Sequence, residues 1–424
     1  MRFIEGFPSA KSVLCRQAPR TLLETNEREQ TVRHIIDDVR TRGDAALFDY
    51  TLQLDGVKLT SLEITRKQVK AAYEEVTSEL RAALELAANR IAAFHTAQKK
   101  EIRGAATGGS KQLVRPLARI GIYVPGGTAS YPSTLLMTTI PARVAGVGEI
   151  ILTTPPAGNG AVPPLTLVAA DITRVDRIFS IGGAQAIAAL AYGTESIPRV
   201  DKLCGPGNVF VTIAKKLVYG EVGVDGLCGP SEVMIIADET ANPEYCAADL
   251  VAQAEHDTLA TAILITTSKR LANEVKQKVK EQLEELPRRD IATESLEKRG
   301  VIAVVASPDE AIALANSHAP EHLCLMMEKA DSYVDRIANA GCIVMGRKAT
   351  VVLGDYVAGP SHVLPTGGTA RFSSALNVSD FMKITSLINT DELDLKELGE
   401  AASAIARAEG LEAHARTMEK RREG

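Results

Sequence analysis

The character of the chain changes at Arg119-Ile120-Gly121-Ile122-Tyr123-Val124-Pro125-Gly126-Gly127, where an apolar run ends in a proline and two glycines. From there, short apolar runs alternate with helical segments, at residues 120–124, 150–153, 177–181 followed by 184–191, and 209–218. Such alternation is typical of a parallel sheet with helices on both faces. The stretch therefore predicts a doubly wound α/β domain, in which loops beyond the carboxyl ends of the strands bind ligands.

A second region repeats this pattern further along the chain. Its expected strands are the apolar runs at residues 233–236, 262–266, 301–305 and 342–345. Residues 1 to about 118 have the apolar spacing of amphipathic helices, and residues 390–424 read as a polar helical ending. The sequence thus predicts the α/β fold class, with a helical N-terminal region and a small helical tail.

Composition excludes several classes of function. The chain has 424 residues, of which 45% are apolar, and a net charge of -5 with dispersed Lys and Arg, so it has no basic footprint for nucleic acid. No apolar run approaches membrane-spanning length, and residues 1–8 lack the basic and apolar blocks of a signal peptide. We therefore expect no membrane partner and a cytoplasmic location. The six cysteines form no CxxC pair, which is typical of reduced thiols.

A candidate site lies in residues 354–368, a run with repeated glycines and prolines that carries Asp355 and His362. These glycines and prolines are incompatible with a long helix or a central strand, so the run predicts a shaped loop that holds binding groups. The alternative is an ordinary surface loop whose Asp and His are solvated.

Two further polar pairs stand out. Asn242 followed by Pro243 predicts the start of a helix, on which Gln253 and His256 lie three residues apart, share a face and are placed to grip one ion. Alternatively, His256 is a packed or solvated histidine.

Glu321 and His322 follow Ala319-Pro320, where a helix capped by Ser307 gives way to an extended segment. Their side chains then diverge, which suits two separate proton transfers, and the alternative is an exposed polar pair at a strand start. Five of the seven histidines fall in the second half of the chain, as do Gln253, Glu321 and Asp355. Nitrogen and oxygen donors of this kind suit zinc or a neighbouring divalent metal.

Several motifs in this order resemble those of the histidinol dehydrogenase family, zinc enzymes that oxidise L-histidinol to L-histidine with NAD. The resemblance covers nearly the whole chain and rests on residues 119–127, 182–187, 205–208, 229–232, 253–257, 319–323, 354–368 and 409–414. It implies two Rossmann-like domains, one inserted in the other: residues 1–118 with 235–375, and the insert 119–234. The tail, 376–424, is expected to reach the site of a partner subunit in a homodimer.

The resemblance also implies roles for individual residues. The expected ligands of one zinc per subunit are Gln253, His256, Asp355 and His414, and Glu321 and His322 are the expected proton-handling pair. Substrate contacts are expected from Ser231, His362 and Glu409, together with the metal ligands and His322. The expected NAD contacts are Tyr123, Gln185 and Asn208. NAD follows from the resemblance only, because Phe210 occupies the last glycine position of a G-x-G-x-x-G pattern that begins at Gly205.

The resemblance implies a reaction in two hydride transfers. His322 takes the hydroxyl proton in each transfer, Glu321 activates water on the bound aldehyde, and zinc acts mainly as a template. The alternatives are a zinc hydrolase, a dehydrogenase of a related amino alcohol, and a two-lobed binding protein whose metal is structural. The sequence has neither H-E-x-x-H nor G-x-S-x-G, which disfavours the hydrolase.

Overall fold

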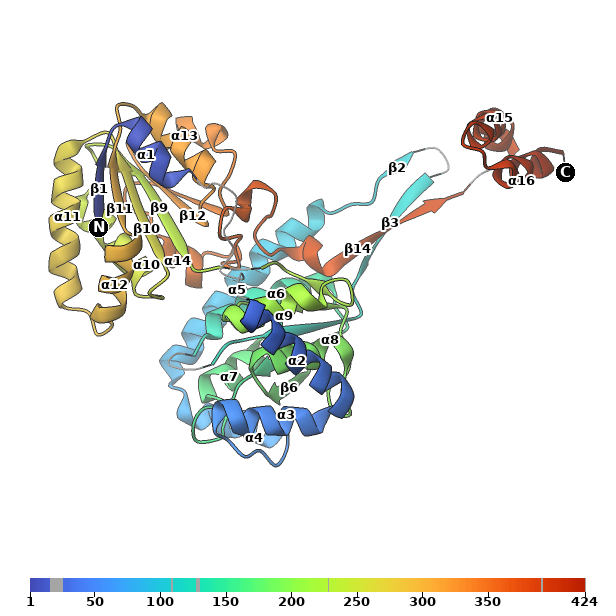
Figure 1. Cartoon of the computed structure of the whole chain (residues 1–424), viewed down its shortest axis with the longest axis horizontal. Helices are drawn as coiled ribbons and strands as arrows, with labels where there is room; N and C mark the ends of the chain where they lie inside the picture. The colour runs from blue at the N-terminus through green and yellow to red at the C-terminus, as the bar shows by residue number, and fades with distance from the viewer. Residues whose placement is uncertain (16–25, 108–109, 127–129, 228, 390–391, 424) are drawn as a thin grey trace.

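The computed structural model describes residues 1–15, 26–107, 110–126, 130–227, 229–389 and 392–423. Gly127, which ends the motif 119–127, and Cys228 lie outside the described residues. Two parallel sheets, each covered by helices, form two bodies, and a narrow arm carries the C-terminal helices away from both (Figure 1). The predicted α/β fold class is confirmed.

One body is built on a parallel sheet of six strands. Its strand order is β1 (Arg2–Glu5), β11 (Val301–Val304), β10 (Thr261–Thr266), β9 (Glu232–Ala237), β12 (His322–Met326) and β13 (Cys342–Met345). The central strand β9 is buried along its whole length, as expected for a strand with helices on both faces. One face packs on α10 (Pro243–Ala254), α11 (Lys269–Glu284) and α12 (Arg289–Arg299), and the other on α1 (Phe7–Leu14) and α13 (Pro308–His318).

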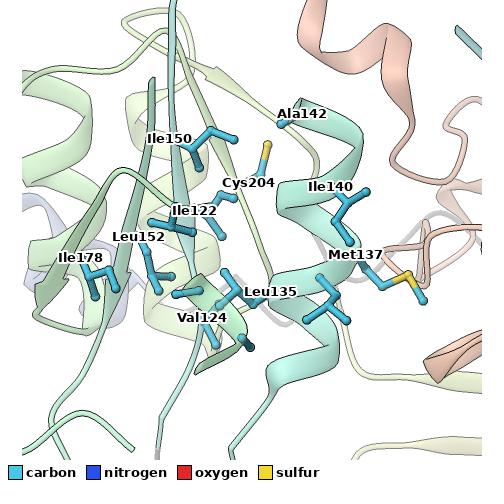
Figure 2. Packing of buried hydrophobic residues seen from close by; sticks show 14 of the residues in the cluster. Ile122, Val124, Leu135, Met137, Ile140, Ala142, Ile150, Leu152, Ile178 and Cys204 are labelled. Atoms are coloured by element: carbon cyan, nitrogen blue, oxygen red, sulfur yellow. The ribbon is translucent and has the colours of Figure 1, made fainter. Parts of the chain in front are cut away.

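The other body is built on a parallel sheet of five strands. Its strand order is β6 (Arg177–Ser180), β5 (Glu149–Thr154), β4 (Arg119–Tyr123), β7 (Lys202–Cys204) and β8 (Gly223–Val224). Four helices cover one face: α4 (Arg66–Glu75), α5 (Ser78–Glu101), α6 (Pro132–Ala145) and α7 (Pro164–Ile172). Figure 2 shows this core, in which Ile122 and Leu152 of the sheet face Leu135 of α6. The other face packs on α2 (Asn26–Arg42), α3 (Asp44–Tyr50), α8 (Gly183–Tyr192) and α9 (Val209–Val218).

The expected domain boundaries stay a prediction, and the packing adds one observation to them. Residues 2–5 pair with the six-stranded sheet and α1 packs on it, whereas the helices between residues 26 and 101 pack on the five-stranded sheet. We therefore propose to group α2 to α5 with the inserted segment 119–234.

The arm is an antiparallel sheet of three strands, β14 (Met382–Ile388), β3 (Ser110–Pro116) and β2 (Ala106–Thr107). It leads to α15 (Glu392–Ala408) and α16 (Glu412–Glu423), which pack on each other at its end (Figure 1). Short turns complete the chain, namely η1 (Thr51–Asp55), η2 (Ala330–Arg336), α14 (Val351–Tyr356), η3 (Thr369–Arg371) and η4 (Val378–Phe381). No helix within the described residues is long and apolar enough to cross a membrane.

Most expected elements are present. The apolar runs predicted as strands correspond to β4, β5, β6, β9, β10, β11 and β13, and the run at 209–218 is helix α9. Asn242 caps α10 by accepting a hydrogen bond from Glu244, with Pro243 in the first turn, as predicted. The prediction that residues 1–118 are helical was wrong at β1, β2 and β3, because β1 and β3 are defined by partners distant in sequence and β2 pairs with β3.

Candidate functional site

The expected catalytic pair lies where the six-stranded sheet begins. Helix α13 ends at His318, since Ala319 adopts a left-handed conformation with φ 53° and Pro320 cannot continue the helix. Strand β12 then starts at His322, and both Glu321 and His322 are only 6% exposed. The alternative of an exposed polar pair is therefore wrong.

The backbone of one residue, Glu232 at the start of β9, holds both members of this pair. Its N–H donates to Oε2 of Glu321 over 2.7 Å, and its carbonyl oxygen lies 3.2 Å from Nδ1 of His322. The same Nδ1 lies 3.7 Å from Oε2 of Glu321, and Nε2 of His322 lies 3.3 Å from Oδ1 of Asp355. The two side chains are thus fixed by main-chain atoms of a buried strand.

These contacts change the proton affinities of the pair. Burial raises the pKa of Glu321 to about 7, against the opposing influence of His322. Burial lowers the pKa of His322, but its contact with Asp355 and the charge of Glu321 outweigh that effect and raise the pKa to about 9. Groups that exchange protons near neutral pH inside a buried site are typical of acid–base catalysis.

Asp355 lies in the last turn of the short helix α14 (Val351–Tyr356). The prediction of an irregular loop is therefore wrong for residues 354–356, where the cap by Thr350 starts a helical turn, and holds for residues 357–365. His362 folds back onto this turn, since its Nδ1 donates to the carbonyl oxygen of Asp355 over 2.7 Å. Burial raises the pKa of Asp355, but the contact with His322 and the charges of nearby imidazoles lower it overall.

Gln253 lies in the last turn of α10, which runs back toward the amino edge of its sheet and ends at Ala254. His256 lies two residues beyond that end, in a bend, so the prediction that both residues lie on the helix and share a face was wrong for His256. Gln253 is 3% exposed, and burial lowers the pKa of His256 against the opposing charge of Asp355. An amide oxygen, a neutral imidazole and an ionised carboxylate are donors that zinc or a neighbouring divalent ion accepts. Gln253, His256 and Asp355 therefore fit a metal as three of its ligands.

His414, the fourth predicted metal ligand, does not lie with the other three predicted ligands in the same chain. His414 and Glu409 are exposed in the tail, which Figure 1 shows apart from the six-stranded sheet. In the part of the chain that the structure describes, no group of three or more His, Cys, Asp and Glu is assembled around a common centre. The predicted ligand set within the described chain is therefore incomplete, and His414 as a metal ligand stays a prediction.

Ser231 immediately precedes Glu232 and is partly buried, so it lies beside the catalytic pair. Its carbonyl oxygen accepts a hydrogen bond from the N–H of Thr261 over 3.0 Å, which fixes the segment to β10.

The three expected NAD contacts lie at the carboxyl edge of the five-stranded sheet. The hydroxyl of Tyr123, at the end of β4, accepts from the N–H of Gly183 over 3.3 Å. Gln185 is 1% exposed in the first turn of α8, and its Oε1 lacks a hydrogen-bond partner among the described residues. Asn208 caps α9 through its side-chain oxygen, which leaves its amide N–H groups to donate. The uncapped start of α8, the buried oxygen of Gln185 without a partner among the described residues and the amide donor of Asn208 fit a dinucleotide at this edge.

Three residues of the site were not singled out from the sequence. Besides Glu232, they are Asp249 on α10 and Thr350, whose hydroxyl donates to Oδ1 of Asp249 over 2.7 Å. This bond joins the helix of Gln253 to the helix of Asp355. The spacing of Asp249 and Gln253, four residues apart on one helix, is the signal in the sequence that could have indicated Asp249.

Comparison with known proteins identifies the family and the fold of the chain. Residues 18–422 match the family model described as histidinol dehydrogenase. A histidinol dehydrogenase of Dehalococcoides mccartyi (strain CBDB1) is 54% identical and covers 100% of both chains, and one of Moorella thermoacetica is 52% identical over 92% of this chain and 94% of its own. The crystal structure of a histidinol dehydrogenase from Elizabethkingia anophelis superposes with a TM-score of 0.94, at 36% identity, over 99% of this chain and 98% of that one. The chain therefore belongs to the histidinol dehydrogenase family, whose members are oxidoreductases.

Proposed function

We propose that this chain oxidises L-histidinol to L-histidine with NAD, through bound L-histidinal, as the last step of histidine biosynthesis in the cytoplasm. Family membership supports the reaction class. The observation that carries the proposal is the buried pair of Glu321 and His322, both fixed by the backbone of Glu232.

His322 is the proposed base for the substrate hydroxyl. Its Nδ1 donates to the carbonyl oxygen of Glu232, so Nε2 is the nitrogen that accepts a proton. In the free chain, Asp355 holds a proton on this nitrogen from 3.3 Å. A ligand that takes up the Asp355 carboxylate frees Nε2 to act as a base.

Glu321 is the proposed base for water. Its Oε2 is occupied by the N–H of Glu232, so Oε1 remains to accept a proton from water that adds to the aldehyde carbon. A carboxyl group with a pKa of about 7 is both ionised and basic enough for this task near neutral pH. His322 then takes a hydroxyl proton from the hydrate in the second oxidation.

Both cofactors are part of the proposal. Gln253, His256 and Asp355, with His414 from a second copy of the chain, are the proposed ligands of zinc. Zinc bound there supplies a template that orients the amine and imidazole of the substrate. Further substrate contacts are assigned to Ser231, His362 and Glu409. NAD supplies the acceptor for both hydrides, at the edge formed by Tyr123, Gln185 and Asn208.

The proposed homodimer explains the position of the tail. Helices α15 and α16 stand at the end of the arm, apart from both sheets (Figure 1). Leu398 and Ile405 of α15 are 56% and 60% exposed, and Leu411 is 42% exposed, so the tail has apolar surface available for another body. A tail that docks on a second copy buries these side chains and completes the predicted ligand set there.

A stoichiometric assay tests the proposal. L-Histidinol and excess NAD should yield about two NADH for each L-histidine formed, whereas an amino alcohol without an imidazole should yield little. His322→Gln should lose both oxidations. The matched control is His318→Gln, a buried histidine that is hydrogen-bonded to Leu14 on α1, and it should keep them. Absence of NADH with L-histidinol, or release of one NADH and free aldehyde, would overturn the proposal.

A further inference from the structure

The loop at residues 205–208 follows β7 and leads into α9. Its first residue, Gly205, has φ +114°, and a Cβ added there would lie 2.0 Å from the carbonyl oxygen of Tyr123. The loop backbone therefore passes directly against the end of β4, in a conformation that only glycine adopts readily. Its last residue, Asn208, is one of the proposed NAD contacts.

Both polar groups of the Gly205 backbone are held by a single ion pair. The N–H of Gly205 donates to Oδ2 of Asp225 over 2.7 Å, and its carbonyl oxygen accepts from Nζ of Lys215 over 3.0 Å. Lys215 also forms an ion pair with Oδ1 of Asp225. The side chains of Lys215 and Asp225 are 3% and 1% exposed, so the whole arrangement is buried.

The pair connects three segments that meet at this edge. Lys215 lies on α9, which begins after Asn208, and Asp225 follows β8 and is bound through its N–H to the carbonyl oxygen of Leu203 on β7. A shift of Gly205 would therefore break charge-assisted hydrogen bonds to two segments at once.

The energetic cost of burying Lys215 and Asp225 indicates that this ion pair positions the loop rather than simply stabilising the fold. Removing two charges from water is costly, and a well-packed apolar pair of similar volume is often as stable or more stable. An apolar pair, however, supplies neither a donor for the carbonyl oxygen nor an acceptor for the N–H of Gly205. What Lys215 and Asp225 add is the fixed path of this loop.

We propose that Lys215 and Asp225 are positioning residues for the dinucleotide, which hold residues 205–208 in the conformation that receives it. The inference rests on the proposed function, because it assumes that NAD binds at Asn208. Neither residue is assigned contact with NAD, and both act through the backbone of Gly205.

The test compares variants of the full-length chain. Lys215→Met removes the donor to the carbonyl oxygen, and the double variant Lys215→Met/Asp225→Asn does so without leaving a buried charge unpaired, so it carries the test if the single variant fails to fold. The control is Lys202→Met at the opposite end of β7, where Nζ donates to the carbonyl oxygen of Asp380 over 2.8 Å. Thermal unfolding, calorimetric binding of NAD and steady-state kinetics are measured for each protein.

The double variant should raise both the Kd and the KM for NAD on the order of 10- to 100-fold, the loss that accompanies a charge-assisted hydrogen bond, with kcat and the KM for L-histidinol changed little. The control should lose thermal stability and keep its affinity for NAD. A double variant that unfolds earlier yet binds NAD as the control does would overturn the inference alone. Wild-type protein that neither binds nor reduces NAD would overturn the proposed function together with it.

Discussion

Replacing Glu321 by glutamine separates the two oxidations that we propose. The side chain is 6% exposed, and its Oε2 accepts the N–H of Glu232 over 2.7 Å. Glutamine has the same shape, and its amide oxygen keeps this acceptor role. The substitution therefore removes the basic carboxylate and leaves the hydrogen bond that positions it.

Oxidation of the aldehyde should fall by ~10²- to 10⁴-fold, which corresponds to roughly 3–5 kcal/mol in the activation barrier. Oxidation of the alcohol should fall far less, because His322 keeps its contacts with Glu232 and Asp355. In the wild type, the rate with aldehyde should rise with pH through about 7, where Glu321 ionises, and this rise should be absent from the variant.

The same pKa predicts an effect on stability. The folded chain keeps a proton on Glu321 up to about pH 7, whereas the unfolded chain loses it near 4.5. A carboxyl group whose pKa is higher in the folded state than in the unfolded state contributes its full stabilisation at a pH below the pKa of the unfolded state. This contribution to the free energy of unfolding is lost as the pH rises through the pKa of the folded state. At pH 8 the ionised, buried carboxylate costs on the order of 3 kcal/mol of unfolding free energy. Glu321→Gln should therefore be at least as stable as wild type at pH 8.

The assay uses L-histidinol and L-histidinal as separate substrates, with NADH followed in single-turnover and steady-state experiments and stability measured by urea unfolding. The matched control is Glu328→Gln, which makes the same change at an exposed residue just beyond β12. Equal losses with both substrates would refute the division of labour. A variant less stable than wild type at pH 8 would refute the account of burial.

Three further outcomes are expected. Purified protein should contain about one divalent metal per chain, and elemental analysis that finds less than half of that, with full activity after prolonged chelation, would contradict the ligand set. Co-refolding of His414→Ala chains with His322→Ala chains, which are each nearly inactive, should restore about a quarter of wild-type activity. About half of the dimers are hybrids, and each hybrid has one intact site of two. A tail that folds onto its own chain predicts no recovery of activity. Gly205→Ala should lower the thermal stability of the protein far more than Gly220→Ala. Both glycines have a positive φ, but only a Cβ at position 205 meets backbone, at the carbonyl oxygen of Tyr123. Equal losses of stability would show that this close contact relaxes.

Local signals in the sequence predict much of the fold, because they act within a few residues. Pro320 cannot continue the helix that ends at His318, so the start of an extended segment near His322 is predictable, and the start of α10 is predictable from the cap at Asn242. The turn that carries Asp355 was missed because glycine at 354 weakens a helix, whereas the cap by Thr350 and its bond to Asp249 on α10 stabilise it. That bond joins residues 101 positions apart and has no local signature.

The residues of the candidate site also differ in how far the sequence indicates them. Motif order, through the family resemblance, indicates Glu321, His322 and Asp355, because Asp and Gly are common in ordinary turns and residue types alone leave a solvated alternative open. The role of Glu232 could not be predicted from its residue type. Its backbone makes the contacts with Glu321 and His322, and almost any residue supplies the same N–H and carbonyl groups. Main-chain contacts of this sort depend on strand register, which becomes visible only in the assembled sheet.

The position of strand β1 in the sheet affects the order in which the parts of the molecule fold during synthesis. Residues 2–5 pair in register with residues 301–304, so β1 has no partner strand until synthesis has advanced some 300 residues further. At roughly 5–20 residues per second, synthesis of that length takes about 15–60 s. The helices from residue 26 and the strands up to residue 224 are complete long before then, and they pack on each other without β1. These helices and strands are therefore expected to pack first, before Leu376, Val378 and Phe381 complete their core, and β1 to wait, unpaired, until β11 has been made.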